Sequence, residues 1–159
     1  MLAQPAPPPP RRAFISSLMA GILASTGLGT RQAVAAAPEA IRQPDRPAPE
    51  AFVARAFEMR RQAVESGDQA YGAVVVRSGR IVGQSPSRVV LDGDPTAHAE
   101  MAAIRDAARR LGSRDLDDSV LYSSSRACPM CEAAAYWAGI ERLVYGSEGR
   151  DGGVPTLCG

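Results

Sequence analysis

Helical and β-strand patterns alternate along residues 50–147, and this alternation limits the chain to one broad class of fold. Apolar residues at helical spacing predict three helices, and short runs rich in Val, Ile, Leu and Tyr predict four strands. In chain order these elements cover residues 51–65, 71–77, 80–84, 95–112, 120–123, 129–138 and 142–145. The first two strands form a hairpin, whereas strands joined by helices pair in parallel and need helices over the sheet. We therefore expect an α/β fold, with at most one further edge strand within residues 154–158.

Length and charge exclude several classes of protein. The chain has 159 residues, which suits one domain, and 45% of them are hydrophobic, which suits a packed core. Its 18 basic residues are all Arg and face 17 acidic ones, so the net charge of +1 argues against a general binder of polyanions. Three Cys are too few for a disulfide scaffold, and no uniformly apolar run is long enough to suggest a multi-pass membrane protein.

Residues 1–35 have the pattern of an export signal rather than of a domain. Arg11-Arg12 precede a mildly apolar run over residues 13–29, and Ala33-Val34-Ala35 form a small-residue cleavage pattern. Arg11 to Ile15 resemble the twin-arginine export motif, which predicts a periplasmic protein without a permanent membrane anchor. Two alternatives remain. In the first, the apolar run is a helix that stays in the membrane. In the second, the start codon is misassigned and Met19 or a later Met is the true start, so that the protein would be cytoplasmic.

A Pro-rich stretch separates this signal from the predicted domain. Residues 36–49 contain four Pro and show no apolar periodicity, so we interpret them as a flexible linker. The folded domain is expected over residues 50–159.

Two fragments at predicted helix starts carry the chemistry. His98, the only His in the chain, and Glu100 lie in the first turn of the second helix. Cys128 precedes Pro129, which favours the first helical position, and Cys131 lies one turn further on the same face. Thiolates at a helix N-terminus are stabilised by the exposed N–H groups and by the helix dipole.

These residues together favour a catalytic zinc site. Two Cys and one His make three protein ligands, and a catalytic zinc site keeps its fourth position for water. Glu100 is the candidate proton carrier beside that water. Each residue also has a simpler interpretation when it is taken singly. The Cys pair could be a redox pair, the His could be a packed residue, and the Glu could simply interact with the helix dipole in the first turn. Their combination at the starts of two successive helices makes these interpretations weaker.

The same fragments resemble the zinc-dependent cytidine and deoxycytidylate deaminase superfamily, whose signature is His-x-Glu followed by Pro-Cys-x-x-Cys. The resemblance covers about residues 50–147 and is nearest to the guanine deaminase and tRNA adenosine deaminase branch. The matching segments are Tyr71–Val76, Asp94–Glu100, Ala103–Arg105, Cys128–Cys131 and Tyr136–Gly139.

The resemblance implies a three-layer α/β/α sandwich with a mixed sheet, and usually a homodimer. It implies that His98, Cys128 and Cys131 hold Zn²⁺ and that Glu100 moves the proton during hydrolytic release of ammonia. It also implies substrate contacts at Ala99, Ser87 and Tyr71. The substrate expected is a small-molecule nucleobase or nucleoside, with guanine slightly favoured and no nucleic acid as partner.

The chain departs from the family pattern at three positions. Ala127 replaces the Pro before the first Cys, Arg126 stands where Glu is usual, and Ser87 replaces an Asn that contacts substrate in many relatives. These changes keep open a non-catalytic zinc-binding protein with an eroded pocket. A thiol redox protein and a tRNA adenosine deaminase are weaker alternatives. Tyr136 and Trp137 are expected to make core or dimer contacts rather than to touch substrate.

Overall fold

The computed structural model describes residues 40–157. The predicted export signal, the first residues of the Pro-rich stretch and Cys158 lie outside the described residues. Within residues 40–157, every helix is too short or too polar to cross a membrane.

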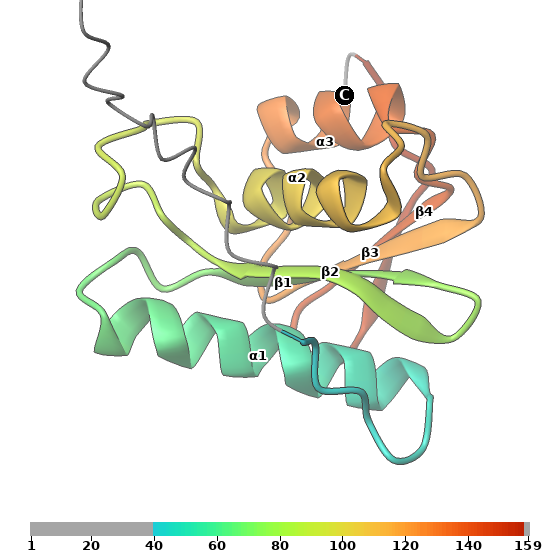
Figure 1. Cartoon of the computed structure of the whole chain (residues 1–159), viewed down its shortest axis with the longest axis horizontal. Coiled ribbons are helices and arrows are strands. Elements are labelled where there is room, and N and C mark those ends of the chain that lie inside the picture. Colours follow the sequence, from blue (N-terminus) through green and yellow to red (C-terminus); the bar gives the residue numbers. More distant parts are fainter. Residues whose placement is uncertain (1–39, 158–159) are drawn as a thin grey trace, which may run out of the picture. The chain divides into compact units, whose positions relative to one another are not determined.

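Three helices and five strands make up the described part of the chain, coloured from blue to red in Figure 1. The helices are α1 (Pro49–Glu65), α2 (Ala99–Leu111) and α3 (Pro129–Trp137). The strands are β1 (Gly72–Arg77), β2 (Arg80–Pro86), β3 (Ser119–Ser123), β4 (Arg142–Tyr145) and β5 (Arg150–Gly153). Their order along the chain confirms the predicted alternation.

The strands form one mixed sheet in the order β2-β1-β3-β4-β5. β1 is antiparallel to both β2 and β3, so these two neighbours run in the same direction on either side of it. β3 and β4, which α3 connects, are parallel, and β5 is antiparallel to β4. The carboxyl ends of β2 and β3 therefore lie at the same end of the sheet, and the chain leaves both towards a helix.

Helices cover both faces of the sheet, which confirms the three-layer sandwich. Figure 1 shows α1 on one face and α2 with α3 on the other. Successive residues of β1 alternate between the layers, as a pleated strand requires: Ala73 and Val75 pack with α2, whereas Val74 and Val76 pack with α1. The sheet thus has two apolar faces, each with its own core.

Two glycines let helices lie directly against the sheet. A Cβ atom at Gly72 would be 2.2 Å from the backbone N of Arg60 in α1. A Cβ atom at Gly83 in β2 would be 2.5 Å from the backbone O of Ala103 in α2. No side chain larger than that of Gly fits such gaps. The close approach at Gly83 therefore fixes the distance between α2 and the sheet, and with it the position of the residues at the start of α2.

The second helix begins later than predicted. The sequence placed its start at Pro95, but α2 begins at Ala99, with His98 as the residue before the first turn. The Asp94 carboxylate accepts hydrogen bonds from the backbone N and the hydroxyl of Thr96, both at 2.7 Å. This local turn competes with helical hydrogen bonding and delays the helix.

The edge strand at the carboxyl end also lies elsewhere than predicted. β5 covers Arg150–Gly153 rather than residues 154–158. Pro155 has no N–H with which to extend a ladder, and Thr156 instead donates from its backbone N and its hydroxyl to the Glu132 carboxylate, at 3.2 and 2.9 Å. The chain therefore leaves the sheet after Gly153 and contacts α3.

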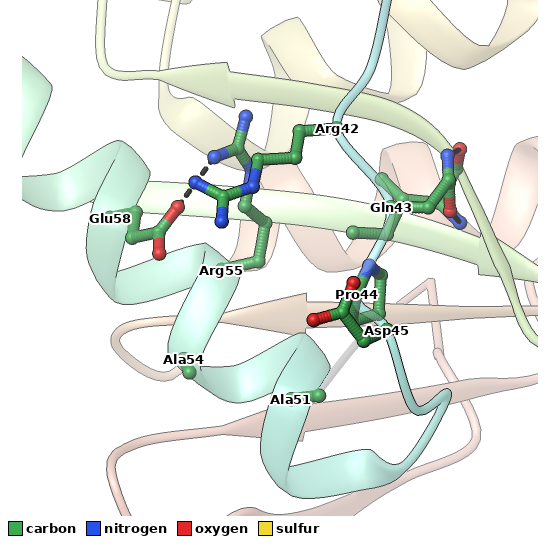
Figure 2. Close-up of a pocket in the computed structure, with 9 residues that line it drawn as sticks. Arg42, Gln43, Pro44, Asp45, Ala51, Ala54, Arg55 and Glu58 are labelled. Atoms are coloured by element: carbon green, nitrogen blue, oxygen red, sulfur yellow. Dashed lines mark hydrogen bonds and ion pairs between the residues drawn. The ribbon is translucent and has the colours of Figure 1, made fainter.

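Residues 40–48 contain no helix or strand but are attached to the domain. The side-chain amide of Gln43 accepts from the N–H of Ile81 at 2.9 Å and donates to its carbonyl at 2.8 Å. Because β2 is an edge strand, this amide satisfies backbone groups that would otherwise be open to another strand. Figure 2 shows the small cavity that this segment forms with α1, where Arg55 pairs with Glu58. Gln43, which lies in the stretch predicted to be a linker, is thus hydrogen-bonded to β2.

Candidate metal centre and active site

His98 and Glu100 lie at the start of α2, where the chain returns from the loop that follows β2. His98 is the cap residue with extended ψ, and its carbonyl accepts the first helical hydrogen bond, from Ala102 at 2.9 Å. The helix proper begins one residue later. Both side chains therefore belong to the turn at which the helix starts, as the sequence indicated.

The two Cys residues lie at the start of α3, directly after β3. Cys128 is the cap residue and Pro129 occupies the first helical position, as predicted. The Cys128 carbonyl accepts from Glu132 at 2.9 Å, and Cys131 is fully buried one turn along. The N-termini of two helices thus supply three side chains of the kinds that bind a metal cation.

The three candidate ligand atoms form a nearly equilateral triangle. Sγ of Cys128 and Sγ of Cys131 are 3.6 Å apart, and each lies 3.7 Å from Nδ1 of His98. Tetrahedral zinc with Zn–S of ~2.3 Å and Zn–N of ~2.05 Å requires S···S of about 3.8 Å and S···N of about 3.6 Å. These separations agree with the structure, so His98, Cys128 and Cys131 fit Zn²⁺ without rearrangement.

This is the one such ligand cluster in the part of the chain that the structure describes. It offers three protein ligands, and Glu100 is not among them. A structural zinc site normally closes with four protein ligands. The arrangement therefore leaves room for a water or substrate atom, which is the pattern of a catalytic site.

Glu100 is buried next to the cluster. Its Oε2 lies 3.8 Å from Sγ of Cys131, and only 5% of the residue is exposed. Burial raises the pKa of its carboxyl above the ordinary value, although a backbone hydrogen bond, the nearby His98 and the Cys131 thiol act in the opposite direction. A carboxyl whose pKa is raised in this way can hold a proton closer to neutral pH than an exposed Glu can.

The Cys131 thiol is in a setting that disfavours its ionisation in the absence of a metal. Burial raises its pKa, and the neighbouring Glu100 carboxylate and Cys128 thiol raise it further. A coordinated metal reverses this preference, because it deprotonates a thiol that binds it. The buried Cys131 side chain thus suits a metal ligand and not a freely reactive thiolate.

A cavity of about 280 Å³ opens beside these residues. Its lining consists of Gln69, Tyr71, His98, Glu100, Ser125, Arg126 and Cys128. Tyr71, a predicted substrate contact, is 44% exposed and offers its ring to the cavity. Two of the three candidate ligands, His98 and Cys128, therefore line the same small cavity as Glu100 and Tyr71.

The other two predicted substrate contacts do not bring their side chains to this cavity. Ala99 packs in the core between α2 and the sheet, so only its backbone could reach a ligand. Ser87 is fully buried, and its hydroxyl makes no regular hydrogen bond. Its nearest acidic neighbour is Asp68, whose carboxylate accepts from the backbone N of Val90 and Leu91, both at 2.9 Å. The Ser87 side chain therefore lies in the interior and is absent from the lining of the cavity.

Asp68 organises this loop as a charged acceptor. Burial alone would raise its pKa, but hydrogen bonds from the backbone N–H groups of Leu91, Gln69 and Val90 outweigh that effect and leave the pKa below its usual value. Asp68 follows α1, and its carboxylate accepts a hydrogen bond from the loop between β2 and α2. It therefore connects the end of α1 to that loop. It thereby also fixes the position of Gln69 at the cavity.

Gln69 and Ser125 line the cavity but were missed by the sequence analysis. Neither belongs to a motif: each lies in a short connection, one before β1 and one after β3. The sequence indicated them only by position: Gln69 lies two residues before Tyr71, and Ser125 lies three residues before Cys128. Ala127, in place of the usual Pro, packs partly against the core and leaves the separations among the three ligand atoms compatible with zinc.

Comparison with known proteins places this geometry in a family. Residues 47–147 match the family described as "Cytidine and deoxycytidylate deaminase zinc-binding region". Guanine deaminase from Bacillus subtilis is 42% identical over 103 residues, which make up 64% of this chain and 66% of that protein. A tRNA-specific adenosine deaminase from Aquifex aeolicus is 36% identical over 109 residues, covering 68% of this chain and 72% of that protein.

Solved structures agree with this relationship. The X-ray structure of guanine deaminase from Bacillus subtilis superposes with a TM-score of 0.59 at 41% identity, covering 62% of this chain and 63% of that one. Guanine deaminase from Nitrosomonas europaea gives a TM-score of 0.59 at 30% identity, covering 62% and 58%. The chain thus spans a little less than two thirds of the length of the guanine deaminases that it matches. With the family match extending over both helix starts and all three ligand residues, the chain belongs to the zinc-binding cytidine and deoxycytidylate deaminase family.

Proposed function

We propose that the chain is a zinc-dependent hydrolase that deaminates a nucleobase or nucleoside, with guanine slightly favoured, and releases ammonia. The observation that carries this proposal is the buried Glu100 carboxyl, 3.8 Å from Cys131 and beside a cluster of only three protein ligands. The preference for guanine is supported by the 42% identity to a protein named guanine deaminase. The small size of the cavity also suits a single base.

Each side chain of the site has a role in this proposal. His98, Cys128 and Cys131 would hold the zinc, which would lower the pKa of a water molecule to ~7 and so supply hydroxide near neutral pH. The Glu100 carboxylate would take one proton from the attacking water and pass it to the ring nitrogen, and would then take the proton of the newly added hydroxyl and pass it to the leaving amine. Its raised pKa suits this sequence, because the carboxyl must both accept and release a proton near neutral pH. Tyr71 offers a ring on which the base can stack.

Two further functions are supported by particular observations. A non-catalytic zinc-binding protein is favoured by Ser87, which lies buried and away from the cavity where many relatives place a substrate-binding Asn. A tRNA adenosine deaminase is supported by the 36% identity to the Aquifex protein. The lack of any Lys among the basic residues makes tRNA the weaker candidate.

We also propose that the protein is exported to the periplasm by the twin-arginine route. Arg11-Arg12 and the small-residue pattern before Ala36 support this, and so does the Cys pair, since that route carries folded proteins in which zinc is already bound. A chain secreted unfolded would risk a disulfide between Cys128 and Cys131. Cell fractionation is expected to show a shortened protein in the periplasm, and an Arg11→Lys, Arg12→Lys variant should accumulate in the cytoplasm. Full-length wild-type protein confined to the cytoplasm would contradict the proposal.

A homodimer is proposed as the assembly, with α3 at its interface. Tyr136 and Trp137 stack edge to face at a centroid distance of 5.5 Å, yet they remain 46% and 72% exposed. Large exposed aromatic side chains favour protein contacts. Light scattering should give twice the chain mass for the wild type and a lower mass for Trp137→Glu. A monomeric wild type would refute this assembly.

The deamination itself is tested by ammonia release from guanine, adenine, cytosine and their nucleosides, using zinc-loaded protein. We expect release from one base or its nucleoside, and a loss of roughly 10³-fold in kcat for Glu100→Ala with the zinc retained. Glu50→Ala, which changes an exposed first-turn Glu of α1, is the matched control and should keep full activity.

Two results would contradict the assignment in different ways. Normal turnover by Glu100→Ala would exclude this residue as the proton carrier. No ammonia from any substrate, with one zinc bound per chain, would favour the non-catalytic protein.

A further inference from the structure

Asp68 is a buried carboxylate between α1 and β1, and it has no role in the chemistry proposed above. Its backbone N donates to the carbonyl of Ala63 at 2.8 Å, so the end of α1 fixes its position. Within residues 40–157 it belongs to none of the ion pairs. Its charge is held by three backbone N–H groups instead, those of Gln69 at 2.7 Å and of Val90 and Leu91 at 2.9 Å. Because an ionised acceptor makes stronger hydrogen bonds than a neutral one, this carboxylate joins two segments firmly.

The first of these segments is part of the cavity wall. Gln69 and Tyr71 both line the cavity, and the backbone N of Tyr71 donates to the Gln69 carbonyl at 2.7 Å. The Tyr71 carbonyl in turn accepts at 3.0 Å from the backbone N of Ser87, the first residue after β2. The backbone of both lining residues is therefore held by a short series of hydrogen bonds that begins at Asp68.

The second segment is the loop that leads from β2 to the start of α2. Val90 and Leu91 in this loop have side chains that are 59% and 50% exposed, so apolar packing contributes little to holding them. The base of the loop is closed by the backbone N of Arg88, which donates to the carbonyl of Ala97 at 3.0 Å. Figure 1 shows this loop at the same end of the sheet as the connection between α1 and β1. Asp68 thus attaches the loop before the metal cluster to the segment that lines the cavity.

We propose that Asp68 is a positioning residue for substrate binding, whose carboxylate keeps the wall formed by Gln69 and Tyr71 in place relative to the zinc ligands. The proposal rests on the function proposed above and adds to it a residue outside the cavity lining that sets the affinity for the base. The zinc ligands are held separately, at the starts of α2 and α3. Loss of the carboxylate should therefore loosen the wall and spare the metal.

Asp68→Asn removes the charge with little change of shape, and steady-state kinetics would compare it with the wild type as full-length, zinc-loaded proteins. The substrate is whichever of guanine, adenine, cytosine and their nucleosides releases ammonia with the wild type. We expect KM to rise about tenfold, as the loss of charge-assisted hydrogen bonds implies, with kcat within about twofold and the zinc content unchanged. Asp68→Glu keeps the charge but displaces it by one methylene, so its KM should lie between the two. Should Asp68→Asn fail to fold, the Glu variant supplies the same comparison.

Amide hydrogen exchange on the same proteins tests the wall without depending on turnover. Exchange should be faster in Asp68→Asn at the three amides that donate to this carboxylate and at Tyr71, and unchanged in α3. Asp115→Asn, the same substitution at an exposed Asp, is the matched control and should change neither KM nor exchange.

The proposal would be overturned if Asp68→Asn left KM and the exchange of Tyr71 unchanged, or if its kcat fell together with its zinc content. A wild type that releases no ammonia would instead refute the proposed deamination. The exchange at Tyr71 would then decide by itself whether Asp68 holds the wall.

Discussion

The site depends on two helix N-termini that meet at one end of the sheet. β2 and β3 run in the same direction on either side of β1, so the helices that follow them start near each other. The contact of α2 with Gly83 and the capping of α3 by Cys128 then bring one imidazole nitrogen and two sulfur atoms to within 3.7 Å of one another. Burial favours the neutral thiol of Cys131, so its ionisation is coupled to metal binding.

Burial acts in the same direction on the two ionisable groups at this centre. It raises the pKa of the Cys131 thiol and the pKa of the Glu100 carboxyl above their ordinary values. Low exposure therefore favours the protonated form of both side chains, and a bound metal would reverse this for Cys131.

The centre was predictable from the sequence because its signals are local. Pro129 after Cys128 marks a helix start, and the spacing of Cys131 places it one turn further on the same face. The order of helices and strands likewise predicted the layers, although a local Asp94–Thr96 turn delayed α2 and Pro155 moved the edge strand. What could not be predicted depends on contacts between distant segments. The burial of Ser87 near Asp68, the Gln43 amide on Ile81 and the place of Gln69 at the cavity are such cases.

The central claim is a zinc centre with two sulfur ligands, one nitrogen ligand and one position left open. Zinc K-edge X-ray absorption on the purified protein tests it most directly. The account predicts one zinc per chain, two sulfur atoms at ~2.3 Å and two lighter atoms at about 2.0–2.1 Å, with one sulfur fewer or no zinc in Cys131→Ser. A zinc surrounded by sulfur alone, or a wild-type protein that binds no zinc, would contradict it.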